Sequence, residues 1–182
     1  MTVDATALEG LCRGLLAAIG EDPDREGLAG TPARWARWWA EFVDYDAGTT
    51  DRTFECVTVD QLVMVRGIRV WSLCEHHLLP FSATISMGYI TTGRVLGLSK
   101  FARVAHDAAH RLQLQERLVS DISAELHRLT GSDDVGVVAT GEHLCMTMRG
   151  IRTAGDMVTS CLTGRFLSTE LRAEFLGLSR EG

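Results

Sequence analysis

Apolar residues recur at every third or fourth position near the N-terminus, which is the spacing of a helix with one buried face. This pattern predicts a helix over residues 4–20 that ends at Gly20. A second helix is predicted to begin at Thr31 and Pro32, because a capping residue followed by proline is a common helix start. It carries an aromatic stripe, expected to be core or subunit contact: Trp35, Trp38, Trp39 and Phe42.

The pattern changes to short β-branched runs between residues 56 and 90, where VMVRGIRVWSLC and FSATISMGYI predict antiparallel strands. A helical stretch follows Ser99 and ends near Gly131. Its apolar register slips over residues 112–115, so either two helices or one kinked helix is expected. The runs VGVVAT, HLCMTMR and MVTSCL then predict strands, and STELRAEFL predicts a short closing helix.

Strands followed by helix and then strands indicate an α+β fold, an antiparallel sheet with helices on one face. The N-terminal helices are expected to be an appendage. We therefore predict a single domain over residues 1–182, with N-terminal helices in 1–50 and the core in 51–182.

Composition and charge narrow the classes of function. The 182 residues are 46% hydrophobic, but they contain no apolar run of membrane-spanning length and no secretory start, so a soluble, cytoplasmic protein without a membrane partner is expected. The net charge of -6 argues against nucleic-acid binding, which needs an excess of basic residues. A small phosphorylated ligand remains compatible with this charge.

Cysteine and histidine gather at two places in the sequence and suggest a metal site. The five cysteines, an odd number, are not spaced as a disulfide framework. Cys74 lies three residues before His77, and His143 lies two residues before Cys145. Sulfur and imidazole ligands suit zinc, and two cysteines with one histidine leave a position for water, as in catalytic sites.

The spacing alone leaves the ligand set open. His143 and Cys145 would share one face of a strand, whereas the neighbours His76 and His77 would point apart unless a turn before Pro80 redirects them. A closed structural site of Cys74, His77, His143 and Cys145 is therefore one alternative, and buried residues without metal are another.

A candidate anion site lies in the sequence GLSKFAR, where a glycine delivers Ser99 and Lys100 to a helix start, with Arg103 one turn later. Backbone N–H groups and cations at a helix start suit phosphate. Lys100 is the only lysine among 18 basic residues. Three further arginines could join this site or remain solvated at the surface: Arg34, Arg37 and Arg149.

Gln115 and Glu116 interrupt the apolar helical stretch in RLQLQERL. A carboxylate there can accept paired hydrogen bonds from a planar donor pair such as that of guanine. The alternative is that Glu116 pairs with Arg111 or Arg117.

These motifs, in the order CEHHLLPF, GLSKFARV, RLQLQERL and GEHLCMTMRGI, resemble those of the GTP cyclohydrolase I family. The resemblance covers about residues 7–177. It implies the tunnelling fold, assembly as a homodecamer of two pentamers with active sites between subunits, and GTP as the substrate. The implied reaction opens the guanine imidazole ring by hydrolysis, releases formate and forms 7,8-dihydroneopterin triphosphate, at the start of folate or 7-deazapurine synthesis.

The same resemblance implies a role for each site residue. Zn²⁺ would be held by Cys74, His77 and Cys145, and His76 and His143 would transfer protons. Ser99 would assist the ribose rearrangement, and Gln115 with Glu116 would hold the guanine. The triphosphate would meet the remaining cations: Lys100, Arg103, Arg149, Arg34 and Arg37.

Two rivals keep the fold but change the function. One is a zinc-binding structural or binding protein without turnover, which has no need of two free histidines. The other is a zinc-free nitrile reductase of the same fold, which the cysteines and histidine disfavour.

Overall fold

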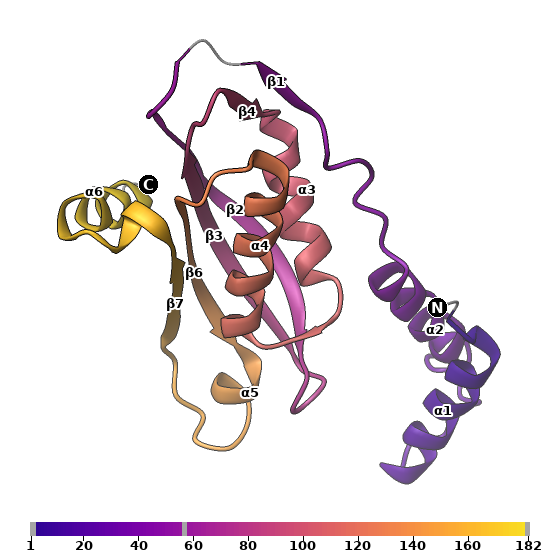
Figure 1. The fold of residues 1–182 in the computed structure, drawn as a ribbon. Coiled ribbons are helices and arrows are strands. Elements are labelled where there is room, and N and C mark those ends of the chain that lie inside the picture. The colour runs from indigo at the N-terminus through magenta and orange to yellow at the C-terminus, as the bar shows by residue number, and fades with distance from the viewer. Residues whose placement is uncertain (1–2, 56–57, 181–182) are drawn as a thin grey trace. The chain divides into compact units, whose positions relative to one another are not determined.

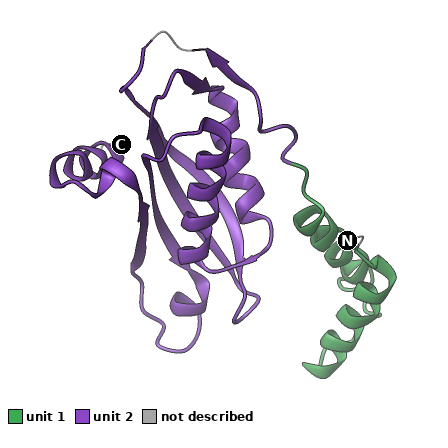
Figure 2. Ribbon diagram, viewed as in Figure 1, with its two compact units in different colours: residues 1–46 green, residues 47–182 purple. Residues whose placement is uncertain are grey.

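A computed structural model describes residues 3–55 and 58–180, and Cys56 lies outside this part. The chain divides into two compact units, residues 1–46 and 47–182, shown in green and purple in Figure 2. This division lies close to the predicted boundary after residue 50. That the whole chain is one domain stays a prediction.

The first unit contains the two predicted helices, α1 (Ala5–Ala18) and α2 (Thr31–Val43). The side chain of Asp4 caps α1 by accepting a hydrogen bond of 2.9 Å from the N–H of Ala7. Proline stands in the first turn of α2, as predicted. The aromatic stripe of α2 is partly core, because Phe42 is buried whereas Trp38 is exposed.

The second unit is built on a five-stranded sheet of order β5-β2-β3-β6-β7. The long strands β2 (Leu62–Cys74), β3 (Pro80–Ile90), β6 (Val135–His143) and β7 (Asp156–Leu162) are antiparallel, as predicted. The two-residue strand β5 (Leu112–Gln113) was not predicted and pairs parallel to β2. A separate pair is formed by β1 (Thr53–Glu55) and β4 (Arg94–Leu96).

Two helices cover one face of this sheet, α3 (Leu98–Ala109) and α4 (Gln115–Thr130), as Figure 1 shows. The slip in apolar register therefore marks two helices with β5 between them. α4 ends at Gly131, which adopts the left-handed conformation that favours glycine. The α+β class and the two helices on one face agree with the tunnelling fold that the resemblance implies.

The opposite face of the sheet is partly covered by the C-terminal segment, a short 3-10 helix η1 (Gly164–Leu167) and α6 (Thr169–Arg180). Phe166 and Phe175 form a buried cluster there with Ile90 and Val138. The adjacent Val137 belongs to the main core under α3 and α4. Successive residues of β6 thus serve two cores, as the alternation of a strand requires.

The prediction of a strand over HLCMTMR is wrong beyond its first residue. β6 ends at His143, and residues Leu144–Thr147 form the short helix α5. On the side of β7, the last paired residue of β6 is Glu142. On the side of β3, it is His143, which pairs with Phe81. After His143, β3 and β7 provide no further backbone hydrogen-bond partners. The residues that follow therefore do not form a strand, although apolar and polar residues alternate along them.

In the described part of the chain, no helix combines the length and apolarity needed to cross a membrane.

Candidate metal centre and its surroundings

The candidate metal centre lies at the hairpin end of the sheet, where β2 turns into β3. The N–H of Cys74 donates to the carbonyl of Leu79, and the N–H groups of His77 and Leu78 donate back to the carbonyl of Cys74. Leu78 has a φ of 55°, a left-handed conformation that is uncommon for leucine. This tight turn folds the chain back over Cys74, so His77 comes to the same place as the cysteine three residues before it.

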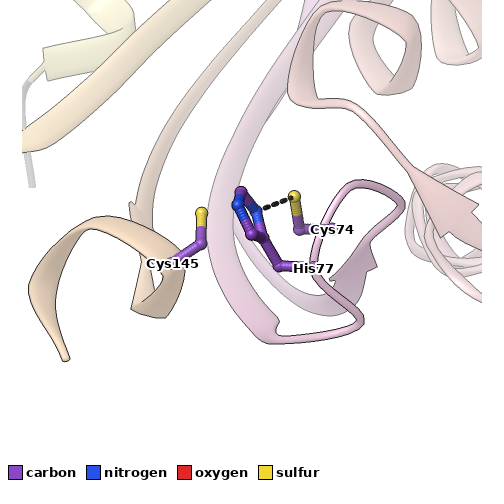
Figure 3. A group of neighbouring side chains, drawn as sticks. All are labelled: Cys74, His77 and Cys145. Atoms are coloured by element: carbon purple, nitrogen blue, oxygen red, sulfur yellow. Dashed lines mark hydrogen bonds between the residues drawn. The ribbon is translucent and has the colours of Figure 1, made fainter. Parts of the chain in front are cut away.

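Three side chains converge there, those of Cys74, His77 and Cys145. Their sulfur and nitrogen atoms all lie within 4.8 Å of one another, and Nδ1 of His77 is 3.7 Å from Sγ of Cys74 (Figure 3). Figure 3 shows that Cys74 and His77 come from the hairpin and Cys145 from the helical turn α5. The predicted set of ligands is therefore assembled, although Cys145 is delivered by a helical turn and not by a strand.

The electrostatics of the cluster fit a cation. Burial raises the pKa of the Cys145 thiol, and the neighbouring Cys74 raises it further, whereas Arg149 lowers it. The Cys145 thiol therefore resists ionisation in the absence of a compensating positive charge. A metal ion would supply that charge and hold both as thiolates.

The other two candidate histidines stand outside the cluster. His76 is exposed, and its ring centroid is 6.2 Å from that of His77. The group that could hold a metal contains three residues of the described chain, and His143 is not among them. The alternative of a closed four-ligand site is therefore not formed.

His143 is held by two buried side chains. Its ring stacks on that of Phe81, with centroids 4.5 Å apart and planes 7° apart, and its Nε2 lies 2.9 Å from Oε1 of Gln115. Burial lowers the pKa of His143, and the nearby Glu116 opposes this shift. His143 therefore has the environment of a neutral imidazole at neutral pH.

Gln115 is only 1% exposed, and its amide is fully engaged. Nε2 donates to the carbonyls of Ala139 and Met157 and to Oγ1 of Thr159, while Oε1 faces His143. The expectation that Gln115 helps to hold guanine stays a prediction. The described structure gives its side chain a different partner.

Glu116 is exposed in the first turn of α4, next to this group. Neither alternative ion pair is formed, because Arg117 pairs with Glu75 and Arg111 lies 3.7 Å from Asp121. No other ion pair of Glu116 occurs within residues 3–55 and 58–180. Its carboxylate is thus available to a ligand.

The predicted anion site lies at the other end of the domain. Leu96, just before α3, donates its N–H to the hydroxyl of Tyr89 near the end of β3, whereas Leu112, just after α3, pairs with Leu73 beside the metal centre. The 12 residues of α3 separate these ends by about 18 Å at about 1.5 Å per residue. Figure 1 shows α3 running from β4 toward the hairpin.

Ser99 is exposed at the start of α3. The basic residues Lys100 and Arg103 contact the segment that precedes β1. Lys100, only 8% exposed, donates from Nζ to the carbonyl and the hydroxyl of Thr49. Arg103 donates to the carbonyl of Ala47. These three residues lie together, but the fold does not bring them to the metal centre of the same chain.

The remaining arginines are divided between the two units. Arg149 lies at the metal centre, where NH1 donates to Nε2 of His77 across 3.1 Å. Arg34 and Arg37 are exposed on α2 of the first unit, where Arg34 donates to the hydroxyl of Thr31. Their contact with a triphosphate stays a prediction.

Two features of this site are absent from the sequence predictions. Phe81 was predicted only as a strand residue in FSATISMGYI, although its place in β3 puts it directly opposite His143. The pair of Glu75 and Arg117 links the hairpin to α4, with Arg117 also contacting Gln113. Both depend on strand register and on the α3–α4 connection, which a single sequence does not specify.

Comparison with known proteins gives a consistent result. Residues 8–180 match the family described as GTP cyclohydrolase I. GTP cyclohydrolase 1 of a Sulfurihydrogenibium species is 44% identical over 180 residues, covering 98% of this chain and 96% of that protein. GTP cyclohydrolase 1 of Aquifex aeolicus is 43% identical and covers 98% of both chains.

A solved structure, the apo form of the archaeosine synthase QueF-Like, aligns with a TM-score of 0.42 and 22% identity. The alignment covers 54% of this chain and 91% of that one.

Proposed function

The chain belongs to the GTP cyclohydrolase I family, and we propose that it opens the guanine imidazole ring of GTP by hydrolysis. The former C8 leaves as formate, and the ribose rearranges to give 7,8-dihydroneopterin triphosphate. The observation that carries this proposal is the convergence of Cys74, His77 and Cys145 beside a separately held His143. A purely structural metal site has no use for that second imidazole.

Zinc is the ion that this donor set fits. Two sulfurs and one imidazole nitrogen within 4.8 Å suit a borderline-soft cation with tetrahedral preference and leave a fourth position for a water molecule. When bound there, zinc lowers the pKa of such a water to near 7 and so supplies a nucleophile at neutral pH. Cys74, His77 and Cys145 would hold the ion, and Arg149 lies beside the cluster as a cation close to His77.

The two histidines outside the cluster move protons. The attack of water on C8 requires a proton for the departing ring nitrogen, and a positioned imidazole near its neutral form can supply it and take it back. His143 is buried against Phe81 and held by Gln115, while His76 is exposed beside the hairpin. His76 adjoins the ligand His77 in the hairpin, and His143 lies two residues before the ligand Cys145.

Glu116 orients the guanine. Its free carboxylate accepts the paired hydrogen bonds of the amino group and the ring N–H of guanine. The N–H groups of the first turn of α4 have no partner inside the helix and can donate to the guanine carbonyl. This geometry selects guanine over adenine, which lacks that donor pair.

The triphosphate is bound by residues of a neighbouring copy. Ser99, Lys100 and Arg103 suit phosphate, yet along α3 they lie about 15, 14 and 9 Å, respectively, from the end of the helix that approaches the hairpin. A homo-oligomer that brings the start of α3 of one copy to the metal centre of the next completes the site. The homodecamer implied by the sequence resemblance is such an assembly.

GTP incubated with the purified, zinc-loaded protein tests the proposal. Formate and a pterin that fluoresces after oxidation are expected, together with loss of both products and of zinc in Cys74→Ala. Full zinc occupancy without formate would instead support the rival, a zinc-binding protein without turnover. That result would contradict the proposed function.

A further inference from the structure

Gln115 shows a hydrogen-bond pattern that fixes the orientation of its amide. Its Nε2 lies 3.2 Å from the carbonyl oxygen of Ala139, 2.9 Å from that of Met157 and 3.1 Å from Oγ1 of Thr159. Carbonyl oxygens only accept hydrogen bonds, so the group facing them is the NH₂. The opposite amide orientation would place three oxygens against one another in a site that is 1% exposed.

The orientation of the amide determines the tautomer of His143. Oε1 of Gln115 can only accept, and it lies 2.9 Å from Nε2 of His143. Nε2 must therefore carry the proton, and Nδ1 of the neutral ring keeps its lone pair. No hydrogen bond to Nδ1 of His143 occurs within the described part of the chain.

The surrounding residues hold this arrangement in place. The ring of His143 lies flat on Phe81, which is fully buried, and this stack fixes the plane of the ring. Gly141 gives Gln115 its room, because a Cβ at that position would collide with Oε1 of Gln115. Phe81 and Gly141 lie on β3 and β6, which are held in register by antiparallel pairing.

We propose that Gln115 is a positioning residue that holds His143 as the Nε2–H tautomer, so that Nδ1 is the atom that exchanges a proton with the substrate. The side chain of Gln115 acts through His143 and does not contact guanine. The catalytic meaning of this inference rests on the proposed function, whereas the tautomer itself is a property of the protein without substrate.

The tautomer is measured by NMR on zinc-loaded protein labelled with ¹⁵N-histidine, in the absence of GTP. The signals of His143 are those missing from His143→Asn. The nitrogen coupled strongly to both carbon-bound ring protons is Nε2, and we expect its shift to be that of a protonated nitrogen. A protonated Nδ1 with a bare Nε2 in the unaltered protein would overturn the proposal.

Three variants separate positioning from other roles. Gln115→Leu removes the acceptor, so a mixture of tautomers and a fall in kcat of about 10- to 100-fold are expected, with little change in the KM for GTP. Gln115→Glu keeps an acceptor beside His143, and as a neutral acid its O–H can donate to the carbonyls that Nε2 of Gln115 faces, so it should retain the tautomer and more of kcat than Gln115→Leu. Gln113→Leu removes another buried glutamine of the α3–α4 connection and should leave the tautomer unchanged.

The outcomes are distinct from those of the proposed function. If Gln115→Leu raises KM and leaves kcat unchanged, its side chain binds guanine and the positioning role is wrong. An unchanged tautomer in Gln115→Leu would also contradict it. Absence of formate from the unaltered protein would refute the proposed function, while the NMR result would still decide the tautomer.

Discussion

Activity in mixed oligomers follows directly from the length of α3. The candidate metal centre and the basic start of α3 lie at opposite ends of the helix, so the proposed shared site would take His143 from one copy and Arg103 from another. His143→Asn damages one end of each chain, and Arg103→Ala damages the other. In a mixed oligomer, some sites then receive an intact end from each kind of chain.

The size of the effect can be worked out. Removing a charge-assisted hydrogen bond costs about 1.5–3 kcal/mol, so Arg103→Ala should lower kcat/KM by roughly 10- to 150-fold. His143→Asn should cost about 100-fold or more, the usual contribution of a positioned acid or base. With random one-to-one mixing in a closed symmetric assembly, about one quarter of the sites hold both intact ends.

The assay is formate release by hybrids made by co-expression of the two variants with different affinity tags. Recovery of about one quarter of the unaltered kcat/KM is expected, well above either parent. A matched control combines His143→Asn with His76→Ala. Because both changes lie at the same end of the domain, no site can be restored. If the first hybrid shows only the mean of its parents, the shared site is wrong.

Cys145→Ser should lose zinc and activity together in metal analysis, and full occupancy would exclude Cys145 as a ligand. His76→Ala should keep its zinc while formate release slows by about 100-fold or more; loss of zinc would make His76 a ligand. Lys100→Arg should raise the KM for GTP although the charge is kept, because the planar guanidinium does not fit where the buried ammonium contacts Thr49; steady-state kinetics showing an unaltered KM would contradict this. Burial, and secondarily His110, lower the pKa of His106 in the folded protein, so the unfolded chain binds a proton at higher pH. The contribution of neutral His106 to stability is complete above the unfolded pKa of 6.5 and is lost as the pH falls through the lower folded value. We therefore expect the free energy of unfolding in urea to fall less between about pH 7.5 and about pH 5 in His106→Asn than in the unaltered protein. Equal falls would contradict a lowered pKa of His106.

The sequence predicts the elements of the fold well where local pattern determines them. The two N-terminal helices and the long strands follow from apolar spacing and from glycine and proline positions, whereas the register slip in the central stretch left two helices and one kinked helix as alternatives. The segment after His143 does not, because its alternating residues fit a strand locally, whereas the neighbouring strands β3 and β7 first begin opposite His143 and Glu142. The end of a strand is set by its neighbours, which a single segment does not reveal.

The site shows the same division between local and distant information. Spacing selects Cys74, Cys145 and a histidine, but it leaves His76 and His77 equivalent until the turn around Leu78 is known. The contact of Gln115 with His143 joins residues 28 positions apart. It depends on how α4 begins over β6, which the segment RLQLQERL alone does not reveal.

Because α3 separates the candidate metal centre from the basic residues of the same chain, the fraction of active sites should depend on the protein concentration. Under the shared-site proposal, an isolated chain is folded yet incomplete, and the fraction of working sites follows the association equilibrium between copies. Specific activity should then fall on dilution below the dissociation constant of that contact, at a concentration that depends on how much GTP is bound. Substrate that bridges two copies strengthens their association, so GTP acts both as the reactant and as a stabiliser of the assembly that consumes it.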